Sequence, residues 1–139
     1  MTEISIEDFC IALYCAYTRF DSMAPDPLGR IAFTTRTLDT DREEYCRVEC
    51  AGVRDFAVRS ESGDAAWGPE DRLELSVVEV EGAPGSWRVW FNPFYQHEIE
   101  FRCRQLRLNG ADVVGRGKHI QDELPSRAAK VPPYSPGAA

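Results

Sequence analysis

Apolar and polar residues alternate with a period of two along most of this chain, which is the pattern of strands with one buried face. The clearest stretch runs from His97 to Arg104. We expect its apolar residues, Ile99, Phe101 and Cys103, to form the buried face. The same alternation predicts strands over residues 30–38, 45–58, 72–81 and 87–91, with Leu106 and Leu108 prolonging the strand that begins at His97.

Four charged residues would line the outward side of that strand: Glu98, Glu100, Arg102 and Arg104. Neighbours on one face of a strand are about 7 Å apart, so we expect these residues to pair with an adjacent strand, for example with Arg47 and Glu49. The spacing of Glu98 and Glu100 would also suit the two carboxylates of a glycoside hydrolase. A solvated charged face explains the same spacing without catalysis, and we favour it.

Turn-forming residues separate the strands. The stretch from Gly82 to Ser86 is short enough for a β-hairpin, and Asn109-Gly110 predicts a tight turn. Pro93 has no N–H group to donate, so the strand before it should end there. At Gly52 the alternation changes phase, and a β-bulge is the predicted cause.

Residues 6–20 fit two patterns. Ser5 and Asp8 have the spacing of a helix capping box, and one helical face would carry Phe9, Leu13, Ala16 and Phe20. The segment also alternates in steps of two, through Phe9, Ile11, Leu13, Cys15 and Tyr17. Because both faces are apolar in that second pattern, we favour a strand that is covered on both sides.

Strands joined by short connectors, without repeated amphipathic helices, predict a mainly β fold: an antiparallel β-sandwich or open barrel of about six strands with few short helical turns. The length of 139 residues fits one domain. We assign this domain to residues 1–124, with one helical turn over residues 119–124. Residues 125–139 are rich in proline and are expected to form a flexible tail.

Charge and hydropathy narrow the class of partner. The chain has 16 basic and 23 acidic residues and a net charge of −7, which repels a phosphate backbone, so nucleic acid is not an expected partner. No run approaches the ~20 consecutive apolar residues of a membrane helix, and the first residues lack the features of a signal peptide. The expected compartment is the cytoplasm, and the acidic balance fits either solubility or a basic partner.

Five cysteines occur without a CxxC pair: Cys10, Cys15, Cys46, Cys50 and Cys103. An odd number argues against a secreted disulfide framework. Cys46 and Cys50 would lie about 13 Å apart on one strand face, beyond the reach of one disulfide or one metal ion. Either could still pair with a cysteine on another strand. We expect the thiols to be buried and to act as small apolar side chains.

Aromatic and polar residues are most concentrated between Trp87 and Glu98. Interleaved rings and amides can form a stacking platform with polar selectors, so the candidate binding residues are Trp87, Trp90, Asn92, Tyr95, Gln96 and His97. If Val89 and Phe91 face the core, Trp90 faces outward and needs a cover or a partner. The loop over residues 60–70 is the expected cover, which makes Trp67 a further candidate.

The polar turn after residue 38 is a second candidate surface, with the acidic residues Asp39, Asp41, Glu43 and Glu44. Its alternating oxygen atoms resemble a calcium-binding loop, but the Gly and the distal Glu of an EF-hand are missing. We therefore favour a plain acidic turn that contacts a partner, and no metal site is expected.

Catalytic motifs are missing from the sequence. It has two histidines and no HExxH, GxSxG or phosphate-binding glycine loop. His97 and Cys103 would be about 20 Å apart on one strand, which excludes a Cys-His pair between them. An enzyme that uses Glu98 and Glu100, or a thiol near His97, is the least favoured hypothesis, and no cofactor is expected.

Four short segments carry a family resemblance: Gly52 to Val58, Trp67-Gly-Pro, Leu73-Glu-Leu and Glu98 to Cys103. Over roughly residues 45–110 the chain resembles a broad group of small bacterial β-rich domains, some of which are immunity proteins of polymorphic toxin systems. The resemblance implies a noncatalytic binder and transfers no functional residue.

The expected function is therefore a noncatalytic interaction protein, of the immunity type, that occludes a basic partner protein. The alternative is a small-ligand or carbohydrate-binding module that uses the aromatic segment from Trp87 to His97. The oligomeric state stays open.

Overall fold

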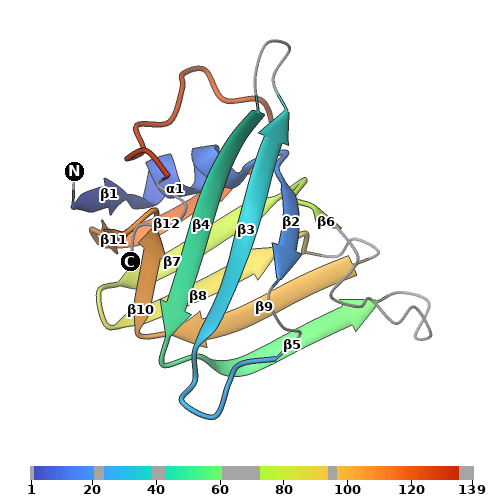
Figure 1. The fold of residues 1–139 in the computed structure, drawn as a ribbon, viewed down its shortest axis with the longest axis vertical. Coiled ribbons are helices and arrows are strands. Elements are labelled where there is room, and N and C mark those ends of the chain that lie inside the picture. The colour runs from blue at the N-terminus through green and yellow to red at the C-terminus, as the bar shows by residue number, and fades with distance from the viewer. Residues whose placement is uncertain (1, 21–23, 39–42, 61–72, 94–96, 135–139) are drawn as a thin grey trace.

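The computed structural model describes residues 2–20, 24–38, 43–60, 73–93 and 97–134, which form two β-sheets packed face to face (Figure 1). The seven-stranded sheet has the order β1 (Glu3–Ser5), β11 (Ala111–Val114), β10 (Gln105–Leu108), β4 (Glu43–Ala51), β3 (Ile31–Leu38), β2 (Tyr17–Phe20) and β6 (Leu73–Glu74). The five-stranded sheet has the order β12 (Gly117–Gln121), β7 (Val78–Ala83), β8 (Ser86–Phe91), β9 (His97–Cys103) and β5 (Arg54–Ser60). The sheets do not close into a barrel, so the predicted mainly β fold is confirmed as a sandwich.

The described residues form twelve strands instead of about six. The difference arises because several predicted strands are divided between the two sheets. Residues 72–81 contain β6 in one sheet and β7 in the other, and the stretch from His97 to Leu108 contains β9 and β10. Neighbouring strands are antiparallel except for β1 and β11, which pair in parallel.

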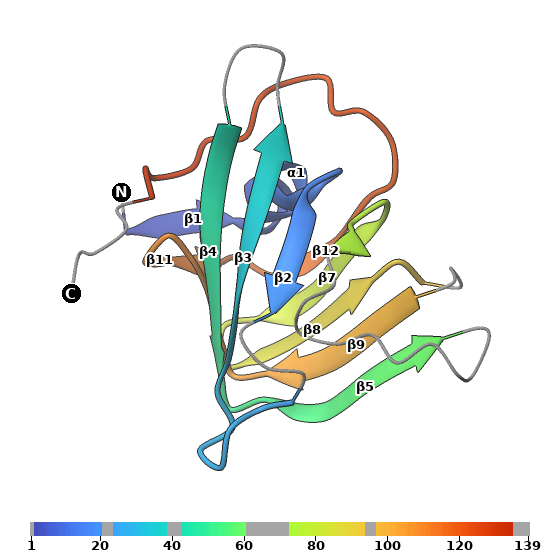
Figure 2. The ribbon, with the colours of Figure 1, turned by 45° about the vertical axis from the view of Figure 1, so that its right-hand side comes forward.

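The strands of the two sheets cross at a steep angle (Figure 2). Two of the places where the chain passes from one sheet into the other are corners at which neighbouring strands meet, as expected of orthogonal packing. At the first corner β4 ends at Ala51, Gly52 has a φ of +66°, and β5 begins at Arg54. At the second corner the N–H of Arg104 donates to the carbonyl of Ala51 over 2.9 Å. The phase change at Gly52 itself is therefore a change of sheet, and a register shift of the bulge type follows in β5, between Arg54 and Ala57.

The predicted turns agree with the structure. Strands β7 and β8 form a hairpin in which Ala83 pairs with Ser86, so that Pro84 and Gly85 make the turn. Asn109 and Gly110 both have positive φ angles between β10 and β11, as a tight two-residue hairpin turn requires. Strand β8 ends at Phe91, before Pro93.

A helix, α1 (Ile6–Leu13), replaces the strand favoured for the N-terminal segment, and only the later part of that segment forms a strand, β2. The capping residues decide this outcome, because the side-chain oxygen of Ser5 accepts a hydrogen bond from the N–H of Asp8 over 3.0 Å. Helix α1 packs against β12 and β7 at one end of the sandwich. Because this helix is buried on most sides, its apolar residues fit both the helical spacing and the alternation in steps of two.

The C-terminal part differs from the predicted helical turn over residues 119–124. Residues Gly117–Gln121 form strand β12, which pairs with β7. Beyond it, the described residues up to Tyr134 contact the domain: the amide nitrogen of Asn109 donates to the carbonyl of Pro132 over 2.8 Å, and Val131 packs against the core.

The core lies between the sheets and is dominated by aromatic rings. Phe33 of the seven-stranded sheet stacks on Phe20 at 4.5 Å between ring centroids and meets the edge of Phe91 at 5.7 Å. Phe91 also contacts Phe101, and Phe101 contacts Phe56. Because rings from both sheets interlock, this cluster holds the two layers together.

Candidate functional site

The aromatic segment from Trp87 to His97 does not form a single platform. Trp87 is 2% exposed and lies on the inner face of β8, so this candidate binding residue belongs to the core. Val89 and Phe91 also point inward, as predicted, and Trp90 lies on the outward face. The guanidinium of Arg88 sits 4.5 Å from the centre of the Trp90 ring, in cation–π contact.

Asn92 is a structural residue and not a polar selector for a ligand. It is 3% exposed and has a φ of +51°. Its amide oxygen accepts from the N–H groups of Ser76 and Val77 over 2.8 and 3.1 Å, and its amide nitrogen donates to the carbonyl of Glu74 over 2.9 Å. The side chain therefore closes the connection between β6 and β7 from a buried position.

His97 is half-buried at the first position of β9, at the opposite end of the strand from Cys103. The predicted absence of a Cys-His pair between these two residues therefore holds. The imidazole Nδ1 is buried and has no hydrogen-bond partner among the described residues.

The remaining candidates fall in parts of the chain that are not described or only partly described. Trp67, Tyr95, Gln96, Asp39 and Asp41 lie outside the described residues, and so does the predicted cover over Trp90. Glu43 and Glu44 belong to β4, where they pair with Leu38 and Thr37 of β3.

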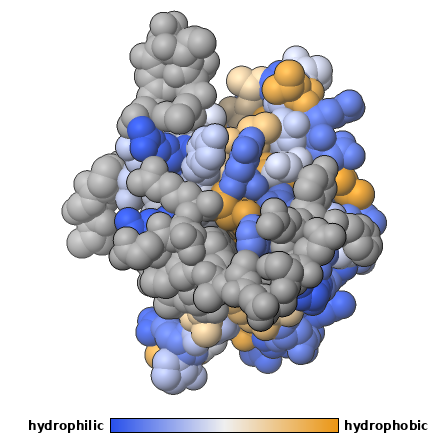
Figure 3. Space-filling view, turned by 90° about the vertical axis from the view of Figure 1, so that its right-hand side faces the viewer, coloured by the Kyte–Doolittle hydropathy of each residue, from blue (hydrophilic) through white to orange (hydrophobic). Residues whose placement is uncertain are grey.

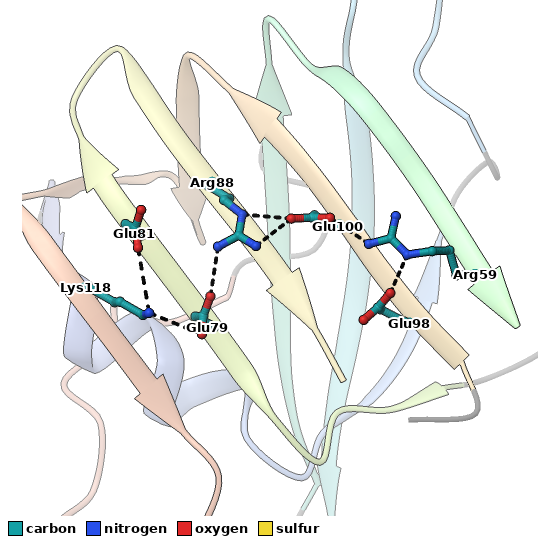
Figure 4. A network of polar contacts seen from close by, with 7 residues as sticks. All are labelled: Arg59, Glu79, Glu81, Arg88, Glu98, Glu100 and Lys118. Carbon is teal, nitrogen blue, oxygen red and sulfur yellow. Dashed lines mark hydrogen bonds and ion pairs between the residues drawn. The ribbon is translucent and has the colours of Figure 1, made fainter. Parts of the chain in front are cut away.

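Two outward charges of β9, Glu98 and Glu100, belong to a network that crosses the five-stranded sheet from β12 to β5 (Figure 4). We call it the charge network, and its members are Arg59, Glu79, Glu81, Arg88, Glu98, Glu100 and Lys118. The predicted partners Arg47 and Glu49 are wrong, because β4 lies in the other sheet. Pairing across adjacent strands is right for Glu98 and Glu100, whose partners are Arg59 of β5 and Arg88 of β8.

Arg88 is the centre of the charge network. Its Nη1 lies 3.1 Å from Glu79, and its Nη2 lies 2.7 Å from Glu100. Arg59 binds both Glu98 and Glu100, with 2.6 Å between Arg59 Nη2 and Glu100 Oε1. Burial alone would raise the pKa of Glu100, but the hydrogen bonds from Arg59 and Arg88 outweigh it and hold this pKa below its ordinary value.

The acidic and basic members of the charge network pair with each other, which indicates a structural role. Glu79 and Glu98 are only 6% and 7% exposed although they lie on an outward face, and each contacts a cation. A glycoside hydrolase needs one carboxyl group that protonates the leaving group, whereas Arg59 binds both Glu98 and Glu100, and the pKa of Glu100 lies below its ordinary value. The network therefore stabilises the sheet and offers no acid–base pair.

A different surface carries exposed aromatic residues. Among the described residues, the large apolar or aromatic side chains that are exposed are Tyr17, Leu28, Tyr45, Val58, Ile120 and Leu124. On the side of the molecule drawn in Figure 3, the apolar side chains of the described residues are scattered between polar ones. Tyr17 and Tyr45 differ from the others because the strand register brings them into one line on the outer face of the seven-stranded sheet.

We call this line the tyrosine row, which consists of Glu74, Tyr17, Arg36 and Tyr45. Tyr17 pairs with Glu74 of β6 on one side and with Arg36 of β3 on the other, and Arg36 pairs with Tyr45 of β4. The two tyrosines are 40% and 43% exposed. The next line on the same face carries Arg19, Thr34 and Arg47.

Sequence reasoning missed the tyrosine row. The alternation of β4 does place Tyr45 outward, because Cys46 and Val48 point inward. The signal for Tyr17 is hidden in the ambiguous N-terminal segment, and its alignment with Arg36 and Tyr45 depends on strand register. The residue pattern within one strand does not determine its register with the neighbouring strands.

A depression of about 380 Å³ lies further along the same sheet face. Its lining includes Asp26, Arg30, Ala32, Glu49, Gln105 and Arg107. The N–H of Arg30, followed by the Arg30 guanidinium and the N–H of Leu28, holds the pKa of Asp26 below its ordinary value. Within the described part of the chain, Glu49 makes no ion pair, which leaves one carboxylate of the depression available.

Comparison of the chain with protein-family models, with curated proteins and with solved structures finds no significant match. The described residues contain no group of His, Cys, Asp and Glu side chains that is placed to hold a metal ion. In the same part of the chain, α1 is too short to cross a membrane.

Proposed function

We propose that this chain is a noncatalytic interaction domain that binds a partner protein through the tyrosine row. The observation that carries the proposal is the alignment of Tyr17, Arg36 and Tyr45 across three adjacent strands, with both tyrosine residues about two-fifths exposed. Tyrosine and arginine are the residue types that most often carry the binding energy of protein interfaces.

The surrounding sheet supports this role. The tyrosine row lies on β2, β3 and β4, which are held by continuous antiparallel pairing. Side chains on such a sheet have their backbone fixed before a partner arrives, so binding orders only side-chain rotamers. The charge network on the opposite sheet is less suited to binding, because a partner would have to break ion pairs that already satisfy each other.

The net charge of −7 favours a partner that is basic overall, because the long-range field of the domain speeds its approach. Arg36 and the neighbouring arginines would then contact carbonyl or carboxylate groups of that partner at short range. A role in occluding a basic toxin, as the family resemblance implies, fits this combination of long-range and local charge.

A binding assay with the products of neighbouring genes tests the proposal. Each product is purified, and its affinity for the wild-type chain is compared with its affinity for Tyr17→Ala/Tyr45→Ala. A matched control is Ile120→Ala, which removes an exposed apolar side chain from the outward face of the other sheet. We expect the tyrosine variant to weaken binding at least about tenfold and the control to leave it unchanged.

Two outcomes contradict the proposal. One is that no product of the panel binds the wild-type chain. The other is that a product binds the tyrosine variant as tightly as it binds the wild type, which would place the interface elsewhere. An association rate that does not fall with added salt would remove the basic partner but would leave the tyrosine row as the contact surface.

A second candidate function is the binding of a small polar molecule in the depression that Glu49 borders. The cavity volume lies within the range of small-ligand sites, and Glu49 of β4 is the direct cross-strand partner of Arg107 of β10. Such a site fits a zwitterion or an amine better than a sugar, because its lining holds no aromatic ring. Thermal shifts with a panel of amino acids and amines, lost in Glu49→Gln, would support it.

A further inference from the structure

The chain after β12 forms no strand or helix within the described residues, and yet its last part is bound to the domain. We call residues 127–134 the C-terminal segment. This segment runs along the outside of the domain and ends on the side where β1 lies (Figures 1 and 2). Residues 122–124 and 126, which connect it to β12, are exposed. The C-terminal segment is therefore held by its own contacts and not by strand pairing.

The first of these contacts places an arginine between two carboxylates of α1. Arg127 Nη1 lies 2.6 Å from Asp8 Oδ1, and Arg127 Nη2 lies 3.0 Å from Glu7 Oε1. The N–H of Lys130 donates to the same oxygen of Asp8 over 3.1 Å. Because Asp8 is buried, losing these donors would leave a buried charge without most of its hydrogen bonds, which is costly. This part of α1 therefore requires a cation and an N–H donor beside it.

The second contact lies at the turn between β10 and β11. Asn109 Nδ2 donates to the carbonyl of Pro132 over 2.8 Å. The amide of Asn109 is fixed in this direction, because its oxygen accepts the N–H of Arg47 over 2.8 Å. Next to this contact, Val131 packs against the core, and Pro132 is buried. Fixed polar groups that flank an apolar contact are typical of a site that recognises a ligand in one orientation.

We propose that these groups form a binding site for an extended basic peptide, and that the C-terminal segment occupies this site as an intramolecular ligand. We call it the segment site, and it consists of Glu7, Asp8, Asn109 and the part of the core that Val131 contacts. The site recognises an arginine, an apolar residue four positions later and the backbone carbonyl of the next residue. A partner protein with an extended segment of this pattern displaces the C-terminal segment.

The charge of the domain favours such a partner. Two carboxylates in the first turn of α1, in a chain with a net charge of −7, attract a basic segment and repel an acidic one. The C-terminal segment is attached by a short connection, which raises its effective concentration at the site to about the millimolar range. It therefore excludes weak competitors, and a partner segment must bind more tightly or be anchored elsewhere on the domain.

The test uses the full chain with a weakened C-terminal segment, Arg127→Ala/Val131→Ala, and a fluorescent peptide with the sequence of residues 126–134. Neither substitution lies in a strand or in the helix, so the sandwich should keep its fold, which near-UV circular dichroism checks. Fluorescence anisotropy should show that this variant binds the peptide at least about tenfold more tightly than the wild type does, because its own segment no longer competes. A control peptide with Arg127→Glu should bind at least about tenfold more weakly.

A substitution on the domain shows where the peptide binds. Glu7 is half-exposed, and Glu7→Lys in the weakened variant places a like charge beside the arginine of the peptide, so the affinity should fall. Glu74→Lys makes the same change of charge at an exposed position of β6 and should leave the affinity unchanged. If the double variant does not fold, Val131→Ala alone replaces it. In either variant the peptide should raise the thermal midpoint, and the Arg127→Glu peptide should not.

Several results would overturn the proposal: equal affinity for the two peptides, equal affinity of the weakened variant and the wild type, or no effect of Glu7→Lys. A wild-type dimer that Arg127→Ala/Val131→Ala converts to a monomer would also overturn it, because the segment of a second copy would then fill the site. Light scattering detects that dimer. The proposal does not depend on the tyrosine row, and Tyr17→Ala/Tyr45→Ala should leave peptide binding unchanged.

Discussion

Asp8 of helix α1 binds Arg127 of the C-terminal segment, with 2.6 Å between Asp8 Oδ1 and Arg127 Nη1. The same carboxylate accepts the N–H of Lys130 over 3.1 Å, and its other oxygen lies 3.0 Å from Ser5 Oγ. One side chain thus completes the helix cap and attaches the segment after β12 to the domain. Only 9% of Asp8 is exposed, so these bonds replace most of its contact with water.

The first prediction concerns pH. Burial alone would raise the pKa of Asp8, but the hydrogen bonds from Arg127, Lys130 and Ser5 lower it below its ordinary value. Because the pKa of Asp8 is lower in the folded state than in the unfolded chain, its carboxylate stabilises the fold at pH values above the unfolded-state pKa. This stability is lost as the pH falls through the folded-state pKa. Urea unfolding between about pH 6 and pH 2 should show this loss, and Asp8→Asn should flatten it.

At neutral pH, Asp8→Asn should lower the free energy of unfolding by about 1–3 kcal/mol, because it removes charged hydrogen bonds of a buried side chain. Glu7→Gln is the matched control, since Glu7 also contacts Arg127 but is half-exposed, and it should change stability by less than about 0.5 kcal/mol. Equal effects of the two substitutions would show that the bonds of Asp8 carry no special weight.

The charge network gives the second prediction. Glu100→Gln removes the partner shared by Arg59 and Arg88 and should destabilise the protein by about 1–3 kcal/mol. Glu81→Gln affects a half-exposed carboxylate whose contact with Lys118 is 3.9 Å long, and the expected change is about 0–0.5 kcal/mol. Chemical denaturation measures both values, and a larger effect at Glu81 would contradict the structural role of the network.

The third prediction separates two tryptophans of one strand. Trp87 is fully enclosed in the core, so Trp87→Ala should cost about 3–5 kcal/mol of stability. Trp90 lies on the outward face under Arg88, and Trp90→Ala should cost about 1 kcal/mol, the size of a cation–π contact with some packing. If both substitutions had the same effect on the thermal midpoint, the inward and outward assignment of β8 would be wrong.

The fourth prediction separates two contributions of Asn92 to stability, which are its side-chain hydrogen bonds and its backbone conformation. Asn92→Ala leaves the N–H groups of Ser76 and Val77 without their acceptor and puts an alanine at a φ of +51°. The expected loss is about 2–4 kcal/mol. Asn92→Gly loses the same hydrogen bonds but removes the backbone strain, so urea unfolding should find it more stable than the alanine variant by about 1 kcal/mol. An alanine variant as stable as the glycine variant would contradict the backbone argument.

The alternation of apolar and polar residues correctly predicted strand orientation where one face of the sheet is buried. The inward positions of β9 and β8, the hairpin at Pro84 and Gly85 and the turn at Asn109 all follow from side-chain alternation and turn chemistry. The helix is the instructive failure. The capping residues Ser5 and Asp8 are correct signals for it, but an element buried on most sides is apolar in either period, so alternation alone favoured the wrong structure.

The candidate site was less predictable, because it depends on which strands are neighbours. Trp87 has the chemistry of a binding residue, and only its position opposite Cys103 on the inner face shows that it fills the core. Glu98 and Glu100 find Arg59 and Arg88 instead of Arg47, because β4 and β9 belong to different sheets. The chain changes sheet near Gly52 and Arg104, and these corners determine the sheet to which each strand belongs. In the sequence they are visible only as interruptions of the apolar–polar alternation.

By itself, the sequence determined the β class, the inward and outward sides of the long strands and the tight turns, since these depend on neighbours within a few residues. The tertiary structure alone decided that Tyr17, Arg36 and Tyr45 form one line and that Glu100 binds both Arg59 and Arg88. These contacts join residues that are far apart in the chain. Their register and sheet membership come from the packing of the whole sandwich, because shifting a strand by one residue would move each of its side chains to the other face.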